Sequence, residues 1–352
     1  MSLINWLRDK PTPRFYLGSR AGYGIRFESD QPVLGSFGLL RFDSTKGSDA
    51  DWEPFGNSRF MVPIEVQTAN PVRSNRRSIA KPHQNPATSI ESDWEQPFQE
   101  AYELLKNQSL RKLVLARKRI YSLSSEPNPL DLLQGLIEAF PTCTPYYFEP
   151  QPGIVFLGSS PEQLYRRQSQ NFYTEAQAGS MPRGLSLEED QQNQQILETN
   201  DRFIHEHEIV VNNILLSLQS LCLDYRITLR REVVKLPNIM HLRTQFQGVL
   251  APSITDEHIL TALHPTAAVC GWPIVESRKS ISQIESFDRG FYAGTMGYIG
   301  PMESEFYVAI RGALLHFPNL SAFAGAGLVP GSISNLESNE ISHKMSFWEK
   351  LL

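Results

Sequence analysis

The 352-residue chain has 41% hydrophobic and 20% charged residues, a formal net charge of −5 and an isoelectric point near 6.0. This composition is typical of a soluble globular protein, and it excludes the basic field that nucleic-acid binding requires. No apolar run reaches the roughly 18 residues of a membrane span, and the first residues lack the apolar core of a signal peptide. We therefore expect a cytoplasmic protein without a membrane partner. Three scattered cysteines predict neither a zinc site nor a disulfide framework.

The first third of the chain contains short strands, one polar segment and then a stronger helix–strand pattern. Short strands are expected at 14–17, 33–41 and 60–66. Residues 70–91 are rich in Pro, Ser and Asn, which is typical of a linker or mobile loop. Helical spacing over 93–107 precedes an apolar strand over 111–121, near whose start Lys112 lies.

The rest of the chain alternates strands with a few helices. Helices are expected at 129–140 and, as the longest, at 188–221. Strands are expected between them at 144–149, 154–157 and 171–178, the last ending in the turn AGSMPRG. The remaining elements are strands at 225–234 and 240–249, helices at 256–263 and 275–285, strands at 292–299, 306–315 and 320–323, and a final helix. Many antiparallel-looking strands with few helices predict an α+β fold with large sheets.

Three charged residues on these elements are candidates for chemistry. Lys112 on its apolar strand is either a general base with reduced basicity or a charge that protects a strand edge. Glu162 in FLGSSPEQL follows a strand, so its carboxyl either points into a pocket or caps a helix. Glu206 borders the apolar stripe of the long helix and is either a boundary charge or a metal ligand. His205 and His207 flank it at a spacing that faces different sides, which excludes a zinc pair.

His264, Arg289 and Arg311 complete the candidates from the middle of the chain. Arg311 lies in an otherwise apolar stretch, VAIRGALL, and a buried guanidinium requires a partner. Either a ligand carboxylate or a structural Asp or Glu would satisfy it.

The C-terminal stretch FAGAGLVPGSISNLESNEISHK combines glycines with helical charges. Gly325, Gly327 and Gly331 lie between an expected strand and helix, where bare backbone N–H groups approach anions. Glu337, Glu340 and Lys344 then share one helix face. Such a face is either solvated or holds a divalent metal between protein carboxylates and an acidic ligand.

Taken together, these segments resemble the chorismate-utilising enzyme family. Nine motifs carry the resemblance in order: KLVLAR, FLGSSPEQL, AGSMPRG, EHEIVV, HLRTQFQG, ALHPTAAVCGWP, FDRGFYAGTMGYIG, VAIRGALL and FAGAGLVPGS with the glutamate and lysine that follow it. They cover about 112–344. The resemblance implies one catalytic domain over 1–352, with a variable part at 1–90 and a motif-bearing part at 92–352. It implies large antiparallel sheets with helices outside.

Two positions discriminate among the reactions of the family. Aminating members carry Gln at the position of Lys112, whereas members that add water carry Lys. Aminodeoxychorismate synthases place a nucleophilic Lys where this chain has Ala178. The resemblance therefore implies an isochorismate synthase acting on chorismate, feeding menaquinone or siderophore biosynthesis, with no obligatory protein partner. The alternatives are a salicylate synthase, which would go on to eliminate pyruvate, and a degenerate binder without turnover.

The resemblance also assigns roles to residues. Lys112 would be the general base that activates water, and Glu162 the general acid that protonates the departing hydroxyl. Glu206 and Glu340 would bind Mg²⁺, with Glu337 as a further or water-mediated ligand. The substrate-binding set is Ser180, Thr244, His264, Tyr298, Arg311, Gly325, Gly327 and Lys344. The chain departs from the family at 202–205, where a Lys-Asp pair is usual, and at 175–177.

Overall fold

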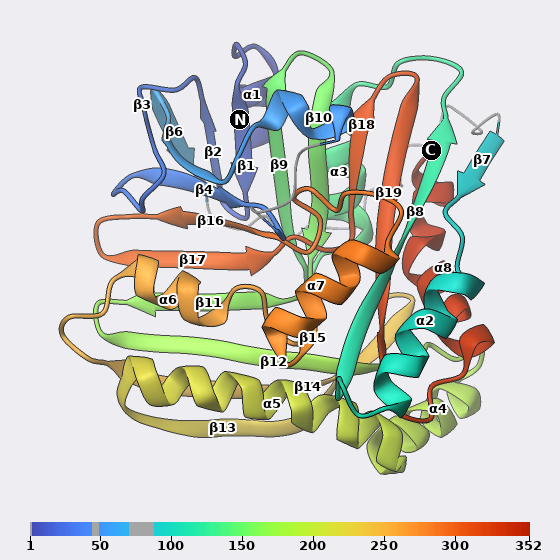
Figure 1. Ribbon diagram of the computed structural model, residues 1–352. Helices are drawn as coiled ribbons and strands as arrows, with labels where there is room; N and C mark the ends of the chain where they lie inside the picture. The colour runs from blue at the N-terminus through green and yellow to red at the C-terminus, as the bar shows by residue number, and fades with distance from the viewer. Residues whose placement is uncertain (1, 44–48, 70–87) are drawn as a thin grey trace.

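Two large antiparallel β-sheets, sheet A and sheet B, form the frame of the molecule. The computed structural model describes residues 2–43, 49–69 and 88–352. Figure 1 shows the strands of sheet A standing upright and those of sheet B running across them below. Helices cover the outer faces of both sheets, which confirms the predicted α+β architecture with large antiparallel sheets.

Sheet A contains ten of the described strands. Its order is β15-β8-β19-β18-β10-β9-β1-β2-β6, and β7 also pairs with β8. Their bounds are β1 (Arg14–Leu17), β2 (Arg20–Tyr23), β6 (Glu65–Thr68), β7 (Thr88–Glu91), β8 (Lys112–Ser122), β9 (Thr144–Gln151), β10 (Ile154–Ser160), β15 (Gly271–Trp272), β18 (Gly312–His316) and β19 (Asn319–Leu328).

Sheet B contains nine of the described strands in the order β13-β14-β12-β11-β17-β16-β4-β5-β3. Their bounds are β3 (Phe27–Ser29), β4 (Ser36–Leu40), β5 (Arg59–Val62), β11 (Gln163–Gln168), β12 (Asn171–Pro182), β13 (Cys222–Lys235), β14 (Ile239–Leu250), β16 (Thr295–Ile299) and β17 (Glu303–Val308). The long edge strand β13 is largely exposed, and register shifts interrupt its pairing with β14.

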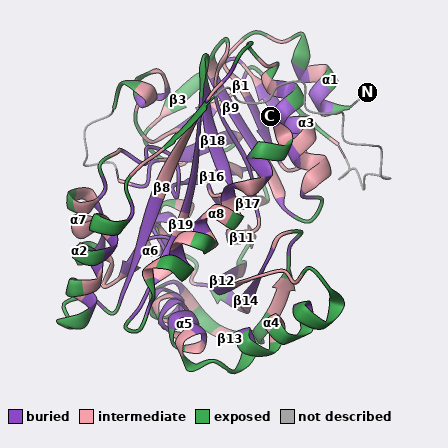
Figure 2. Cartoon of the chain, turned by 90° about the vertical axis from the view of Figure 1, so that its right-hand side faces the viewer, coloured by how far each residue is buried: buried purple, intermediate pink, exposed green. Residues whose placement is uncertain are grey.

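The helices pack on the outside of this frame. They are α1 (Leu3–Arg8), the 3₁₀ helix η1 (Ala50–Phe55), α2 (Glu95–Lys106), α3 (Pro129–Ala139), α4 (Leu187–Thr199), α5 (Asp201–Leu221), α6 (Asp256–Leu263), α7 (Ile274–Ile284) and α8 (Ser334–Leu351). The apolar stripe of α5 lies along β12, and α8 lies along β19. Figure 2 shows the buried strands enclosed by exposed helix faces, with α4 among the most exposed. No described helix has the length and apolar content that crossing a bilayer would require.

The main apolar core fills the space between the two sheets. Trp52 lies at its centre, with edge contacts to Phe55, Phe156 and Phe291 at ring-centroid distances of 5.4–5.9 Å. Gly290 has a φ of +55°, and a Cβ there would lie 2.1 Å from the Trp52 ring. The glycine is therefore required both by backbone conformation and by the approach of the indole.

Several predicted elements have different bounds in the structure. The expected helix over 188–221 is two helices, because Asn200 is non-helical and its side chain caps α5 by accepting from the Arg202 N–H. The expected strand over 306–315 is split between β17 and β18. Strand β19 extends to Leu328, so Gly325 and Gly327 lie within a strand rather than in a loop. Of the expected linker, 70–87 lies outside the described residues, and 88–91 forms β7.

Two of the places where the chain passes from one sheet to the other are adjacent. It leaves β10 of sheet A for β11 of sheet B through Pro161 and Glu162, and it leaves β17 of sheet B for β18 of sheet A through 309–311. Backbone bonds join the two crossings: the Val308 N–H donates to the Glu162 carbonyl at 3.1 Å, and the Ser159 N–H donates to the Arg311 carbonyl at 3.3 Å. Glu162 and Arg311 therefore lie side by side at the junction of the sheets.

Candidate active site

A cavity lies at the junction of the two sheets, where α5 and α8 also meet it. Residues from β8, the two crossings, β12, α5, β14, the 268–269 loop, β19 and α8 form its wall. The lining residues are Val114, Pro161, Glu162, Gln177, Ala178, Gly179, Ser180, Glu206, His241, Ala268, Val269, Tyr292, Ile310, Arg311, Phe323, Ala324, Gly325, Gly327 and Lys344. Seven of the residues predicted from the sequence are among them.

Lys112 and Glu206 meet across strand β19. The Lys112 Nζ lies 3.1 Å from Oε1 of Glu206, and the lysine side chain is fully buried. A Cβ on Gly327 would lie 2.1 Å from that carboxylate oxygen and 2.8 Å from the Lys112 Cε, so only glycine fits beneath the pair. Apart from this ion pair, the Lys112 Nζ has no hydrogen-bond partner among the described residues. Its remaining N–H groups are therefore available to a ligand or a water molecule.

Glu162 is buried as a neutral acid at the first crossing. Its backbone is held by Ser160, whose hydroxyl accepts from the Glu162 N–H at 3.2 Å and donates to the Val308 carbonyl at 2.6 Å. Burial raises the pKa of Glu162 to about 8, the Glu175 charge adds to this, and the charges of Lys112 and Lys344 oppose it. A carboxyl with this pKa retains its proton at neutral pH and can donate it.

Arg311 is a buried guanidinium without a carboxylate in hydrogen-bond range within the described residues. It adopts a φ of +56°, which turns its side chain out of the strand direction and into the cavity. Its Nη2 lies 3.2 Å from Nε2 of His241, and its Nη1 lies 3.4 Å from the Asn238 amide oxygen. The Asn238 amide carries no charge, and His241 is neutral because burial lowers its pKa well below the usual range. The site therefore has a positive charge that an anionic ligand would balance.

Three carboxylates on α5 and α8 form an acidic wall. Glu206 pairs with Lys112, Glu340 pairs with Lys344 at 2.6 Å, and Glu337 pairs with Arg202. Burial raises the pKa of Glu337 to about 7, and the charges of Glu340 and Glu206 add to this effect. The three groups are therefore close enough to repel one another.

This wall suits a hard divalent cation held mainly by oxygen atoms that are not from the protein. Within the described ranges, no three His, Cys, Asp or Glu side chains converge as direct ligands of one metal. Mg²⁺ usually takes only one or two protein carboxylates and completes its shell with water and substrate oxygens. Glu206 and Glu340 fit that mode, with Glu337 beside them.

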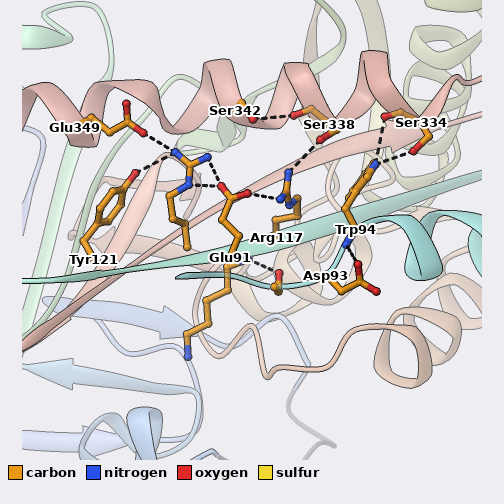
Figure 3. A network of polar contacts seen from close by, with 12 residues as sticks. Glu91, Asp93, Trp94, Arg117, Tyr121, Ser334, Ser338, Ser342 and Glu349 are labelled. Atoms are coloured by element: carbon orange, nitrogen blue, oxygen red, sulfur yellow. Dashed lines mark hydrogen bonds and ion pairs between the residues drawn. The ribbon is translucent and has the colours of Figure 1, made fainter. Parts of the chain in front are cut away.

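A polar network outside the cavity fixes α8 against β8 (Figure 3). Glu91 of β7 pairs with both Arg117 and Arg119 of β8. Arg117 donates to the Ser338 hydroxyl at 3.1 Å, and Arg119 pairs with Glu349 at 2.6 Å. These contacts hold one face of α8, which leaves the face with Glu337, Glu340 and Lys344 turned toward the cavity.

Three residues that we expected to contact the substrate lie outside the cavity lining. Tyr298 lies on β16, where its ring is under the Arg20 guanidinium and against Phe37. The His264 Nε2 donates to the Arg41 carbonyl at 2.9 Å. Thr244 is fully buried beside His207. These placements differ from the expectation that the three side chains line the pocket. The His264 ring and the Thr244 hydroxyl bond to other parts of the fold, and the Tyr298 ring packs against Arg20 and Phe37.

Two residues that sequence reasoning missed occupy the expected positions instead. Tyr292 lines the cavity, stacked on Phe323 at a centroid distance of 5.3 Å. His241 lines it beside Arg311, and its Nδ1 lies 2.9 Å from the Ser180 hydroxyl. Tyr292 lies in the same motif as Tyr298, and His241 lies in the same motif as Thr244, so the motifs indicated the right segments but not which side chain lines the cavity.

Arg289, another candidate, supports the wall from behind. It pairs with Glu285 at 2.5 Å and donates to the carbonyls of Val114 and Val269, which both line the cavity. Both members of the pair are buried, so Arg289 holds two wall segments together and does not reach the cavity.

Known proteins match this chain over most of its length. A profile of chorismate binding enzymes matches residues 64–352. The chain is 32% identical over 370 residues to isochorismate synthase 2, chloroplastic, of Arabidopsis thaliana. This alignment covers 92% of this chain and 65% of that protein. The chain is 36% identical over 259 residues to isochorismate synthase MenF of Pasteurella multocida. That alignment covers 72% of this chain and 60% of the MenF protein. The chain thus spans about three fifths to two thirds of the length of these relatives.

A solved structure shares the fold. The menaquinone-specific isochorismate synthase MenF of Escherichia coli superposes with a TM-score of 0.85, covering 100% of this chain and 92% of that chain at 24% identity. A second match, anthranilate synthase component I of Streptococcus pneumoniae, has a TM-score of 0.73 at 19% identity. At these identities the superpositions establish the architecture and leave the reaction open.

Proposed function

Because the chain belongs to the chorismate-binding enzyme family, we propose that it is an isochorismate synthase, which interconverts chorismate and isochorismate. In this reaction water adds to one ring carbon while a hydroxyl leaves another, so one water enters and one departs. The observation that carries the proposal is a protonated glutamate, Glu162, in the cavity wall, together with a fully buried lysine, Lys112, that contacts the cavity-lining Glu206. The names of the relatives with 30–36% identity support it.

Lys112 and Glu162 are proposed as the base and the acid. Lys112 would take a proton from the incoming water with its Nζ, which is paired with Glu206 and has no hydrogen-bond partner among the described residues. Glu162 would give its proton to the departing hydroxyl. After one turnover Lys112 has gained a proton and Glu162 has lost one. In the reverse direction the two exchange roles, so the step is reversible.

The charged walls are proposed to bind the two carboxylates of chorismate. Arg311 would bind the enolpyruvyl carboxylate through its free guanidinium edge, with the backbone of Gly325 and Gly327 nearby. The ring carboxylate would lie toward the acidic wall, where Glu206 and Glu340 would hold Mg²⁺. When bound there, Mg²⁺ supplies the positive charge that lets a substrate carboxylate approach protein carboxylates. The product would feed menaquinone or siderophore biosynthesis.

Product analysis tests the proposal directly. The purified chain is incubated with chorismate, with and without Mg²⁺, alongside Lys112→Gln. Isochorismate without pyruvate, formed only with Mg²⁺ and absent from the variant, is the expected result. Salicylate plus pyruvate would identify a salicylate synthase instead. If the wild-type chain forms no product, it is a chorismate-binding protein without turnover.

A further inference from the structure

The helix that carries Glu206 has a buried histidine that the proposed chemistry does not use. His205, Glu206, His207 and Glu208 follow one another on α5. His205 is exposed, whereas His207 is fully buried on the side that faces sheet B. His207 is therefore the member of the pair that can act inside the protein.

Every polar atom of the His207 ring has a defined partner. The Nδ1 lies 3.1 Å from the Ala178 carbonyl, and the Nε2 lies 2.8 Å from the Thr244 hydroxyl. A carbonyl only accepts, so the Nδ1 must carry the hydrogen. A ring this enclosed is neutral, so the Nε2 accepts from the Thr244 hydroxyl, whose oxygen in turn accepts from the Arg231 N–H at 3.1 Å.

The carbonyl that His207 binds begins a β-bulge in the cavity wall. The register of β12 against β14 shifts between Ala178 and Ser180, with Gly179 between them at a φ of +76°. All three bulge residues line the cavity, and Gly179 lies against the first turn of α5. A bulge gives up ladder hydrogen bonds, so its orientation depends on partners such as His207.

His207 thus connects two parts of the cavity that come from different elements. Through its own backbone it is adjacent to Glu206, and through its ring it binds the strand that presents Ser180. The Thr244 hydroxyl fixes which nitrogen is protonated. This also accounts for Thr244, which lies in a motif singled out from the sequence but does not reach the cavity.

We propose that His207 is a positioning residue which, oriented by Thr244, sets the distance between the Glu206 carboxylate and the 178–180 bulge. The inference rests on the proposed function in taking this cavity as the chorismate site. Loss of the His207 ring would let α5 and the bulge move independently. Substrate binding would then weaken because Glu206 and Ser180 no longer face the ligand in a fixed relation.

The experiment compares His207→Leu with His205→Leu, a matched change two residues away on the exposed side of the same helix. We expect His207→Leu to raise the KM for chorismate at least tenfold and to weaken Mg²⁺ binding, measured by calorimetry, while His205→Leu changes neither. His207→Gln, whose amide can donate to Ala178 and accept from Thr244, should recover most of the KM. A folded His207→Leu with wild-type KM and Mg²⁺ affinity would overturn the proposal.

A second pair of variants covers the case in which His207→Leu does not fold. Thr244→Val keeps the side-chain shape but removes the hydroxyl, whereas Thr244→Ser keeps the hydroxyl. We expect a raised KM only in Thr244→Val, and a wild-type KM there would contradict the assigned role of Thr244. In ¹⁵N-histidine spectra of the whole chain, His207 should show a protonated Nδ1 and an Nε2 shift that changes in Thr244→Val. These spectra can be recorded without turnover, so they test the hydrogen bonding of His207 independently of the activity. A wild-type chain that is inactive on chorismate would refute the proposed function and leave this test of His207 intact.

Discussion

Lys112 and Glu206 come within 3.1 Å of each other directly over the bare Cα of Gly327. The three residues belong to β8, α5 and β19, which are neighbours only in the folded chain. A glycine in the interior of a strand weakens it, so the position needs a compensating reason. Here the reason is the passage of two functional side chains across the strand.

Gly327→Ala should therefore disable the site without unfolding the protein. The new methyl group would overlap the Glu206 carboxylate and the Lys112 side chain, which must separate. We expect kcat/KM for chorismate to fall at least a hundredfold, about 2.7 kcal/mol of transition-state stabilisation. The control is Gly300→Ala in the β16–β17 turn, where the nearest atom is 3.2 Å away. Equal losses in both variants would contradict the role assigned to Gly327.

Glu162→Gln should remove the alkaline limb of the pH–rate profile. Because burial raises the pKa of Glu162 to about 8, the protonated acid is lost as the pH rises through that value. Wild-type kcat/KM should fall above about pH 8, and the variant should lose roughly 10²–10⁴ in kcat/KM with no decline there. Glu100→Gln on the exposed face of α2 is the control. A variant with wild-type kcat would exclude Glu162 as the acid.

The same carboxyl should make the folded state less stable at high pH. Its pKa is raised in the folded protein above the ordinary 4.5, so its contribution is fully present below 4.5 and is lost as the pH rises through about 8. Glu162→Gln lacks this loss. The difference between the Tm of the variant and the Tm of the wild type should therefore shift in favour of the variant as the pH rises from about 5 to about 9. A constant difference in Tm across this range would show that Glu162 does not titrate as inferred.

Arg311→Lys should weaken substrate binding although it keeps the charge. Lysine lacks the planar fork that can bind a carboxylate through two N–H groups, and it cannot reproduce both contacts to His241 and Asn238. We expect the KM for chorismate to rise about 10–100-fold, as for a lost bidentate contact of about 1.5–3 kcal/mol, with a smaller change in kcat. Arg167 pairs with Asp256 at 3.2 Å and does not line the cavity, so Arg167→Lys should leave KM unchanged. An unaltered KM in Arg311→Lys would move the carboxylate site elsewhere.

The sequence located the charged residues of the site better than its aromatic and histidine residues. Lys112 and Arg311 interrupt apolar segments, Glu206 borders an apolar stripe and Glu162 follows a strand, so each was a candidate from its position. The residues alone left a structural role open for each of them, and the family resemblance assigned the roles. The large antiparallel sheets also followed from the strand-rich pattern. Charge within an apolar run therefore selects candidates without coordinates, but it does not separate a functional residue from a structural one.

The choice between neighbouring residues could not be made from periodicity. Tyr292 rather than Tyr298 reaches the cavity, because the segment before β16 is irregular, with a positive φ at Ala293. His241 and Thr244 lie three residues apart on β14 and so face opposite sides of the sheet, and the packing of distant elements decides which side faces Arg311. Bulges and left-handed residues change the facing of side chains by one position, and only the pairing of distant strands reveals them.

Glu340→Gln should raise the Mg²⁺ concentration that the enzyme requires. Glu340 and Glu206 are the carboxylates that fit the cation, and replacing Glu340 removes one negative charge while leaving an amide of the same shape. We expect the Mg²⁺ concentration for half-maximal rate to rise at least tenfold, with calorimetry on the protein alone showing a parallel loss of Mg²⁺ affinity. Glu349→Gln, on the same helix but bound to Arg119 outside the cavity, should behave as wild type. If Glu340→Gln keeps the wild-type Mg²⁺ requirement and the wild-type Mg²⁺ affinity, Glu340 is not a ligand of the cation.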